Sequence, residues 1–379
     1  MKRIAIFGGT FNPVQNAHVS IAIDSVKKGN LDKLIVMPDY IPPHKQTGNF
    51  LASSSDRINM LKIAFAGEKN IEIGTYETEN KSKSYTYLTM EHFKQIYPND
   101  ELFFIVGSDM LENFPKWKYP ERILNCCKLL YCERADEDKN NAIYNSFIAR
   151  YGAQAVEKLP IKGEDVSSTK VRLYAALGLD ISGFVSSGVN DYITANGLYK
   201  DDRFCEYLKK VLPEKRRIHT AGVVLTSIKI CKQLGIDSEK VALAALLHDC
   251  AKYQKAEDYK DFILPEGVPE SCVHQYLGAY VAEKVLKVTD KEVLDAIRYH
   301  TTGRANMTLT EKIVYVADVI EPSRNFDGVD KLREIVFSDF EKGFKVVLSE
   351  ILKFLNRDCL EVDKLTEEAV KYYCKGDTL

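Results

Sequence analysis

Short apolar runs and helical patterns alternate along the first 200 residues. The apolar runs predict strands at residues 2–7, 33–37, 71–75, 101–106 and 127–132. Between them, apolar residues at helical spacing predict helices at residues 18–28, 55–66 and 86–95. Strands that alternate with helices in this way are typical of βαβ units on a parallel sheet. We therefore predict an α/β domain with a parallel sheet over residues 1–200.

The remainder of the chain carries long helical patterns and little strand signal. Apolar periodicity predicts helices at residues 220–234, 238–252, 277–288, 290–299, 309–320 and 339–356, with prolines in the intervening segments. The polar stretch Lys200-Asp201-Asp202-Arg203 is the expected junction. We predict a second, all-α domain over residues 201–379.

Composition narrows the class of protein. The 379 residues include 52 Lys and Arg against 54 Asp and Glu, so no broad basic surface for nucleic acid is expected. No apolar run approaches the roughly 18 residues of a transmembrane helix, and the N-terminus lacks the pattern of a signal peptide. Nine scattered cysteines without a CxxC motif favour a reduced thiol set. We expect a cytoplasmic protein that binds neither membrane nor nucleic acid.

Two segments of the first domain are suited to phosphate binding. Gly8, Gly9, Thr10 and Phe11 follow a predicted strand and precede a helix, where backbone N–H groups can approach a phosphate closely. The second segment, Ser167-Ser168-Thr169-Lys170-Val171-Arg172, places hydroxyls before a helix that carries an arginine. Either segment alone is also compatible with an ordinary turn or a capped surface helix.

Taken together, these segments resemble the nicotinate mononucleotide adenylyltransferases of the nucleotidyltransferase superfamily. Further matches are Pro42-Pro43-His44-Lys45, Arg57 with Met60-Leu61, Ser84-Tyr85-Thr86, Gly107-Ser108-Asp109 and Trp117. The resemblance covers residues 1–199 and implies a Rossmann-like fold. It also implies adenylyl transfer from ATP, with Mg²⁺, to nicotinate mononucleotide.

The resemblance assigns roles residue by residue. His18 and Arg172 are expected at the triphosphate as catalytic groups. The ATP site would comprise Gly8, Gly9, Thr10, Phe11, Gln15, Gly107, Asp109, Ser167 and Ser168. The nicotinate mononucleotide site would comprise Lys45, Arg57, Thr86 and Trp117.

The catalytic signature departs from the family pattern HxGH. This chain has Gln15-Asn16-Ala17-His18, and Asn12 stands where the family has aspartate. Glutamine donates a neutral hydrogen bond and cannot carry positive charge. Two hypotheses therefore remain open: an active adenylyltransferase, or a degenerate nucleotide-binding sensor that regulates the second domain.

The second domain holds a series of metal-type ligands. Four of the seven histidines of the chain fall there, and two aspartates accompany them: His219, His248, Asp249, His274, His300 and Asp318. His248-Asp249 ends a strongly apolar stretch, and burying that pair without partners would cost several kcal/mol. A divalent metal would satisfy both side chains, although any one of these histidines could equally be a hydrogen-bonded core residue.

The order H…HD…H…H…D resembles the HD phosphohydrolase superfamily, and the surrounding motifs are similar to its YqeK-like branch. This resemblance implies a dinuclear transition-metal centre, with iron favoured, and symmetrical hydrolysis of diadenosine tetraphosphate to ADP. His219, His248, Asp249 and Asp318 would hold one metal, and His274, His300 and a bridging Asp249 the other. Lys252 is expected to act with Asp249 in catalysis, and Arg304 and Arg324 to bind phosphate. The leading hypothesis is thus a bifunctional enzyme acting on small nucleotides, with metal identity and oligomeric state left open.

Overall fold

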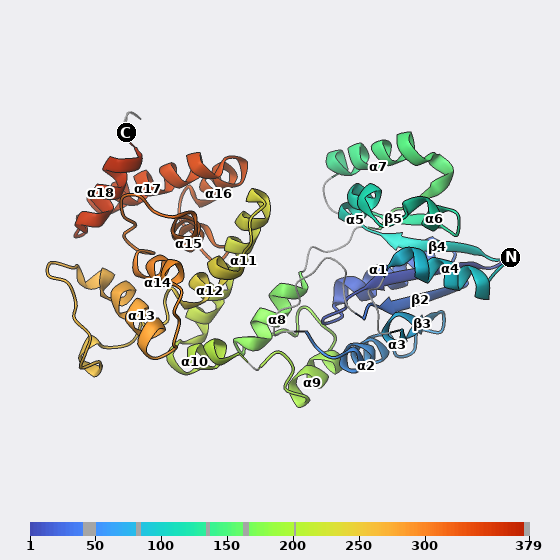
Figure 1. The fold of residues 1–379 in the computed structure, drawn as a ribbon, viewed down its shortest axis with the longest axis horizontal. Helices are drawn as coiled ribbons and strands as arrows, with labels where there is room; N and C mark the ends of the chain where they lie inside the picture. The colour runs from blue at the N-terminus through green and yellow to red at the C-terminus, as the bar shows by residue number, and fades with distance from the viewer. Residues whose placement is uncertain (41–50, 81–84, 134–136, 162–166, 201, 375–379) are drawn as a thin grey trace. The chain divides into compact units, whose positions relative to one another are not determined.

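The computed structural model describes residues 1–40, 51–80, 85–133, 137–161, 167–200 and 202–374 (Figure 1). The chain forms two compact units. The first comprises Met1–Ala175 and Asp180–Asp201, and the second comprises Ala176–Leu179 and Asp202–Leu379. Among the described residues, no helix has the length and apolar character needed to cross a membrane.

The first unit is built on a six-stranded parallel sheet with the order β3-β2-β1-β4-β5-β6. The strands are β1 (Arg3–Gly9), β2 (Lys33–Pro38), β3 (Ile71–Ile73), β4 (Glu101–Val106), β5 (Lys128–Cys132) and β6 (Val156–Leu159). The predicted α/β class and the five predicted strands are confirmed. The prediction missed β6 because its four residues, Val-Glu-Lys-Leu, leave too short an apolar pattern.

Successive residues of the central strand face two separate cores. Ala5 and Phe7 of β1 point to one core, and Ile4 and Ile6 point to the other. The first core is covered by α1 (Asn16–Lys28), α2 (Ser54–Ala64), α8 (Ser168–Ala176) and α9 (Ser187–Ala195). The second is covered by α4 (Thr86–Ile96), α5 (Ser108–Asn113), α6 (Pro120–Leu124) and α7 (Glu137–Tyr151), while α3 (Tyr76–Glu79) follows β3. This two-sided burial explains why the strands read as nearly continuous apolar runs.

The strand order reverses between β1 and β4. Ligands of open parallel sheets bind at the carboxyl ends of the strands beside such a reversal. Gly8 and Gly9 end β1, and Gly107 follows β4 directly. The topology therefore brings two of the predicted nucleotide-binding segments to this edge of the sheet.

The second unit is helical, as predicted. It contains α10 (Arg203–Val211), α11 (Glu214–Leu234), α12 (Glu239–Leu247), α13 (Val273–Lys284), α14 (Lys291–Arg298), α15 (Leu309–Ile320), α16 (Val329–Ser338), α17 (Phe340–Arg357) and α18 (Lys364–Tyr373). Pro213 precedes α11, and Gly235 ends it in the left-handed region at φ 68°.

One helix boundary matters for the site. The sequence predicts a helix to residue 252, but α12 ends at Leu247, and His248-Asp249 occupy the turn that follows. The turn is closed by hydrogen bonds from the Cys250 N–H to the Leu247 carbonyl and from the Lys252 N–H to the Asp249 carbonyl. In a continued helix, the side-chain direction would turn by about 100° around the helix axis at each further residue, including Asp249. Ending α12 at Leu247 instead lets the chain turn with both polar side chains buried.

Candidate active sites

Aromatic rings closely approach the two glycines that end β1. A Cβ at Gly8 would lie 3.0 Å from Cζ of Phe104, and one at Gly9 would lie 3.0 Å from Cζ of Phe11. Phe11 itself has φ 46°, and its ring packs edge-on against His18 with centroids 5.2 Å apart. The close packing around the loop therefore positions the His18 ring beside the end of β1.

Gln15 joins the two predicted phosphate-binding segments. Its Nε2 donates to Oγ of Ser168 at 3.0 Å, and its backbone N–H donates to Nδ1 of His18 at 3.2 Å. Because Nδ1 accepts this bond, a neutral His18 carries its proton on Nε2. Gln15 thus fixes the tautomer of His18 through its backbone, which any residue at this position could do.

Arg172 lies against the same loop. Its Nη1 donates to the Asn12 carbonyl oxygen at 2.8 Å, and its Nη2 donates to Oγ1 of Thr169 at 3.2 Å. The Asn12 side-chain oxygen accepts from the Tyr199 hydroxyl at 2.8 Å and from the Ala52 N–H at 3.1 Å. An amide at position 12 therefore satisfies the two donors that meet its oxygen.

Arg57, predicted to contact the mononucleotide, is a buried residue. Its side chain is only 1% exposed, and its guanidinium donates to the carbonyls of Thr10 and Asp39 at 2.8 and 2.7 Å. It also pairs with the Asp39 carboxylate at 3.2 Å, which in turn accepts from the Thr10 hydroxyl. Burial is the main influence on the pKa of Arg57 and lowers it. Arg57 therefore holds the loop at Thr10 and Asp39 in place.

The other residues predicted for the two nucleotide sites of this unit differ in their burial and contacts. Trp117 is half-buried against Phe104 and Phe114, with ring centroids at 6.0 and 5.3 Å. Thr86 begins α4, Gly107 caps α5 and Asp109 is exposed in the first turn of α5. Ser167 is exposed, and its Oγ accepts from the Lys170 N–H at 3.2 Å. The predicted contact Lys45 lies outside the described residues.

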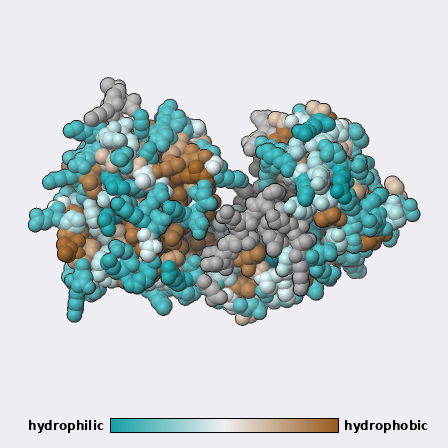
Figure 2. Space-filling view, in the orientation of Figure 1, coloured by the Kyte–Doolittle hydropathy of each residue, from teal (hydrophilic) through white to brown (hydrophobic). Residues whose placement is uncertain are grey.

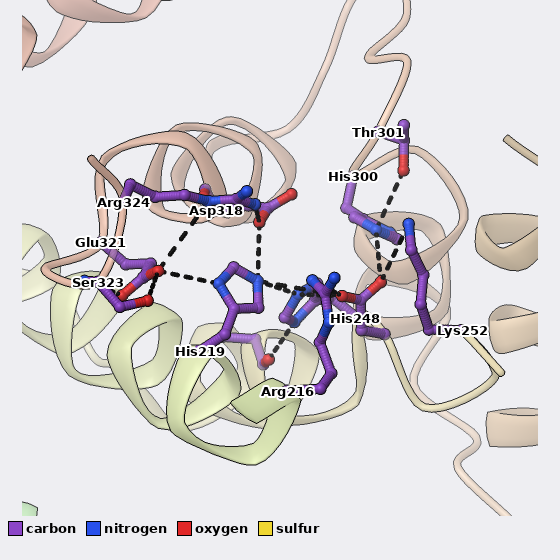
Figure 3. Close-up of polar contacts among 12 residues, drawn as sticks. Arg216, His219, His248, Lys252, His300, Thr301, Asp318, Glu321, Ser323 and Arg324 are labelled. Atoms are coloured by element: carbon purple, nitrogen blue, oxygen red, sulfur yellow. Dashed lines mark hydrogen bonds and ion pairs between the residues drawn. The ribbon is translucent and has the colours of Figure 1, made fainter. Parts of the chain in front are cut away.

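In the second unit, all six predicted metal ligands meet around Asp249. Oδ2 of Asp249 lies 3.4 Å from Nε2 of His248 and 3.9 Å from Nε2 of His219. Nε2 of His219 is 3.0 Å from Oδ1 of Asp318. The ligand atoms of His219, His248 and Asp318 all lie within 4.8 Å of one another. These residues form one group of candidate ligands, contacted by Oδ2 of Asp249 (Figure 3).

The other oxygen of Asp249 faces a second group. Oδ1 lies 3.3 Å from Nε2 of His274 and 3.6 Å from Nε2 of His300, and these two nitrogens are 3.2 Å apart. Oδ1 is buried and lacks a hydrogen-bond partner among the described residues. A carboxylate with one oxygen toward each group has the arrangement needed to bridge two cations.

Hydrogen bonds at Nδ1 of His248, His300 and His219 orient the Nε2 atom of each ring toward the cluster. Nδ1 of His248 contacts the Ala245 carbonyl at 2.7 Å, and Nδ1 of His300 contacts the Ile297 carbonyl at 2.8 Å. Since a carbonyl only accepts, each Nδ1 carries a proton and each neutral ring presents an Nε2 lone pair. Nδ1 of His219 contacts Oε1 of Glu321 at 2.9 Å. Such outer partners hold metal-binding histidines in the required orientation.

Charge in this cluster also suits a divalent metal. Burial disfavours the charged carboxylates, but the neighbouring histidines outweigh it and hold the pKa values of Asp249 and Asp318 well below 3.8. Burial, followed by the nearby His300, lowers the pKa of His274 to about 3. Anionic carboxylates, the neutral imidazole of His274 and a buried oxygen without a hydrogen-bond partner together fit bound transition metals.

Three cations border the cluster. Arg216 donates from Nη1 to Oδ2 of Asp249 at 2.8 Å, and Arg324 donates from Nη2 to Oδ1 of Asp318 at 2.6 Å. Lys252 contacts Nε2 of His274 at 3.0 Å. The guanidinium of Arg304, which we predicted to bind phosphate, donates to both oxygens of the buried Glu311 at 2.7 Å.

No role was predicted for Arg216 or Glu321 from the sequence. Arg216 precedes His219 by three residues on α11, and Glu321 follows Asp318 by three residues at the end of α15. Residues three apart on a helix share a face, so this spacing was the available signal. For Glu321, a further signal was its position directly after the apolar run of α15.

Both domains of the chain are similar to known protein families. Residues 6–173 match the cytidylyltransferase-like family, and residues 216–323 match the HD domain. The chain is 30% identical to a probable nicotinate-nucleotide adenylyltransferase/Ap4A hydrolase of Mycoplasma genitalium, over 92% of this chain and 98% of the relative.

Two single-domain relatives come from Bacillus subtilis. Its symmetrical bis(5'-nucleosyl)-tetraphosphatase is 41% identical over 39% of this chain and 83% of the relative. Its nicotinate-nucleotide adenylyltransferase is 34% identical over 53% of this chain and 100% of the relative. A solved HD superfamily hydrolase of Clostridium acetobutylicum is 36% identical, with a TM-score of 0.43, over 46% of this chain and 96% of that chain. The chain therefore belongs to the family of fusion proteins that join a nicotinate mononucleotide adenylyltransferase-like nucleotidyltransferase domain to a YqeK-like HD domain.

Proposed function

We propose that the chain is a bifunctional enzyme with domains at residues 1–200 and 201–379. The first would transfer an adenylyl group from ATP, with Mg²⁺, to nicotinate mononucleotide. The second would hydrolyse diadenosine tetraphosphate to two ADP with a dinuclear transition-metal centre, iron being the favoured metal. The observation that carries the hydrolase proposal is the Asp249 carboxylate, whose two oxygens face two separate groups of ligands.

The hydrolase residues divide into ligands and phosphate-binding groups. His219, His248 and Asp318 would hold one metal, His274 and His300 the other, and Asp249 would bridge them. Bound metals would supply an activated water at neutral pH and neutralise phosphate charge.

The side chains bordering the cluster would hold the substrate. Arg216, Lys252 and Arg324 place three positive charges beside the ligands, where the central phosphates would lie. In the reaction, water oxygen bonds to one central phosphorus, the bridging P–O bond breaks, and ADP leaves. A second ADP remains as the other product.

The adenylyl transfer needs positioning and charge neutralisation. A phosphate oxygen of the mononucleotide attacks the α-phosphorus of ATP, and pyrophosphate leaves. Nε2 of His18 carries the proton in the neutral ring and would donate to a phosphate oxygen. Arg172, fixed to the Asn12 carbonyl, would place its charge beside the same loop.

The two activities can be separated in the full-length protein. Asp249→Asn should abolish ADP formation from diadenosine tetraphosphate and leave adenylyl transfer unchanged, whereas His18→Ala should do the reverse. Chromatography of the nucleotide products measures both. Loss of both activities in either variant, with the fold intact by circular dichroism, would contradict two independent sites.

The second candidate is a nucleotide sensor in place of the adenylyltransferase. It is favoured by the Gln15 side chain, which occupies the position of a family histidine and bonds to Ser168. A charged donor is worth about 1–2 kcal/mol more than a neutral one. Gln15→His should therefore raise adenylyl transfer about tenfold from a measurable level. No turnover with Gln15 and rescue by histidine would instead support the sensor.

A further inference from the structure

A cavity of about 890 Å³ lies beside the metal-ligand cluster in the second unit. It is formed by α16, α17 and the segment between α15 and α16. Its volume is within the usual range for small-molecule sites. Figure 2 shows hydrophobic surface on this unit near α16. Its apolar lining includes Phe326, Leu332, Ile335, Val347, Ile351 and Phe354.

Two aromatic rings on this lining remain accessible. Phe326 is 45% exposed and Phe354 is 46% exposed, although both are large apolar side chains. Phe326 lies in the segment before α16, and Phe354 lies near the end of α17. Accessible aromatic rings can stack on a nucleobase, whichever base it is.

The cavity is also lined by charged residues of both signs. Arg324, Lys331, Lys353 and Arg357 contribute four positive charges against the two negative charges of Asp327 and Glu350. Three of these cations are ion-paired: Lys353 with Glu350 at 3.3 Å, Arg357 with Asp358 at 2.8 Å and Arg324 with Asp318 at 2.6 Å. An apolar cavity with two accessible aromatic rings matches a ligand that has a flat base.

Arg324 connects this cavity to the metal-ligand cluster. It is one of the residues that line the cavity, and its Nη2 and Nε donate to Oδ1 and the carbonyl oxygen of Asp318 at 2.6 and 2.8 Å. Figure 3 shows Arg324 beside Asp318, so a phosphate chain running from the cluster into the cavity would pass this arginine.

We propose that this cavity binds one nucleoside of the dinucleoside polyphosphate and sets which phosphate bond is cleaved. This proposal rests on the hydrolase function proposed above and adds to it a site for the nucleoside. Binding the base at a fixed place beyond Arg324 holds the second phosphate of that half at the cluster. Because the distance between the bound base and the cluster is fixed, cleavage always occurs beyond the second phosphate, and both products are ADP.

The test uses Phe326→Ala and Phe354→Ala in the full-length, metal-loaded protein. Since stacking on one aromatic ring is worth about 1–3 kcal/mol, the KM for diadenosine tetraphosphate should rise about 5- to 100-fold. Hydrolysis of p-nitrophenyl phosphate, which has no nucleoside, should change less than about twofold. The variants should also release AMP and ATP alongside ADP, because the phosphate register is loosened.

Tyr372→Ala is the matched control. Tyr372 is 52% exposed on α18 of the same unit and does not line the cavity. It should leave KM and products unchanged. Equal KM values in the wild type and both phenylalanine variants would overturn the proposal. A changed oligomeric state with unchanged KM would also overturn it and would identify this face as a subunit interface.

Direct binding separates this proposal from the hydrolase function. Calorimetric titration with the analogue that carries a methylene group between the central phosphates measures affinity without turnover. The phenylalanine variants should lose the part of the affinity for this analogue that comes from the nucleoside, whereas the wild type and Tyr372→Ala should retain it. If the wild type hydrolyses no dinucleoside polyphosphate but this component is still lost, the hydrolase function fails and the nucleoside site stands. If the component persists in both variants, the nucleoside site is wrong.

Discussion

Glu321 should control metal affinity although it lies outside the ligand set. Its Oε1 is 2.9 Å from Nδ1 of His219, and its Oε2 accepts from the Ser323 N–H at 2.7 Å. The carboxylate is 1% exposed, so its charge acts on the imidazole with little screening by water. Glu321→Gln keeps the size of the side chain and removes the charge that polarises His219.

The expected loss follows from this outer position. Replacing the partner of a ligating histidine typically costs 10- to 100-fold in metal affinity, or about 1.4–2.7 kcal/mol. Because glutamine can still accept a hydrogen bond from Nδ1, we expect a loss of about tenfold. Gly222→Ala should act in the same direction, since a Cβ there would lie 2.2 Å from Oε2 of Glu321 and force the carboxylate to move.

Competition with a chromophoric chelator measures the metal affinity. Glu311→Gln is the matched control, because Glu311 is also 1% exposed and ion-paired on α15, but its partner is Arg304. The control should lower the unfolding midpoint and leave metal affinity within about twofold. Unchanged affinity in Glu321→Gln, or an equal loss in Glu311→Gln, would refute the role given to Glu321.

Two further predictions concern stability. Arg57→Ala leaves the Asp39 carboxylate without its buried partner and should destabilise the first unit by about 3–5 kcal/mol, measured by urea unfolding; a loss below about 1 kcal/mol would contradict the bracing role. In chelator-treated protein, His274 has a pKa of about 3 when folded and near 6.5 when unfolded, so only the unfolded chain gains its proton as pH falls between these values. The free energy of unfolding should therefore fall from pH 7 to pH 5, and less steeply in His274→Gln; equal slopes would show that His274 does not contribute.

Fold class was readable from the sequence because both units bury strong apolar periodicities. The α15 pattern predicted residues 309–320, and the structure has Leu309–Ile320. The end of α12 was not readable, since apolar periodicity continues through His248-Asp249 while the backbone turns after Leu247. Hydrogen bonds within that turn decide the boundary, and they leave no hydrophobic signature.

Residue types indicated the metal-ligand cluster, but not the partners that organise it. The order of histidines and aspartates singled out six residues, whereas the separate directions of the two Asp249 oxygens depend on how four helices pack. The ion pairs of Arg57 and Arg304 could not be predicted, because a buried ion pair and a phosphate-binding arginine look the same in sequence. Burial of the carboxylate partner distinguishes them, and only the fold supplies that information.

Metal content of the purified full-length protein tests the two-metal arrangement most directly. Elemental analysis after reconstitution with excess iron and desalting should give about two transition-metal ions per chain in the wild type. Asp249→Asn should retain fewer than one, because both groups of ligands lose the carboxylate that faces them. Full metal retention in Asp249→Asn, or no bound transition metal in the wild type, would contradict a bridged dinuclear site.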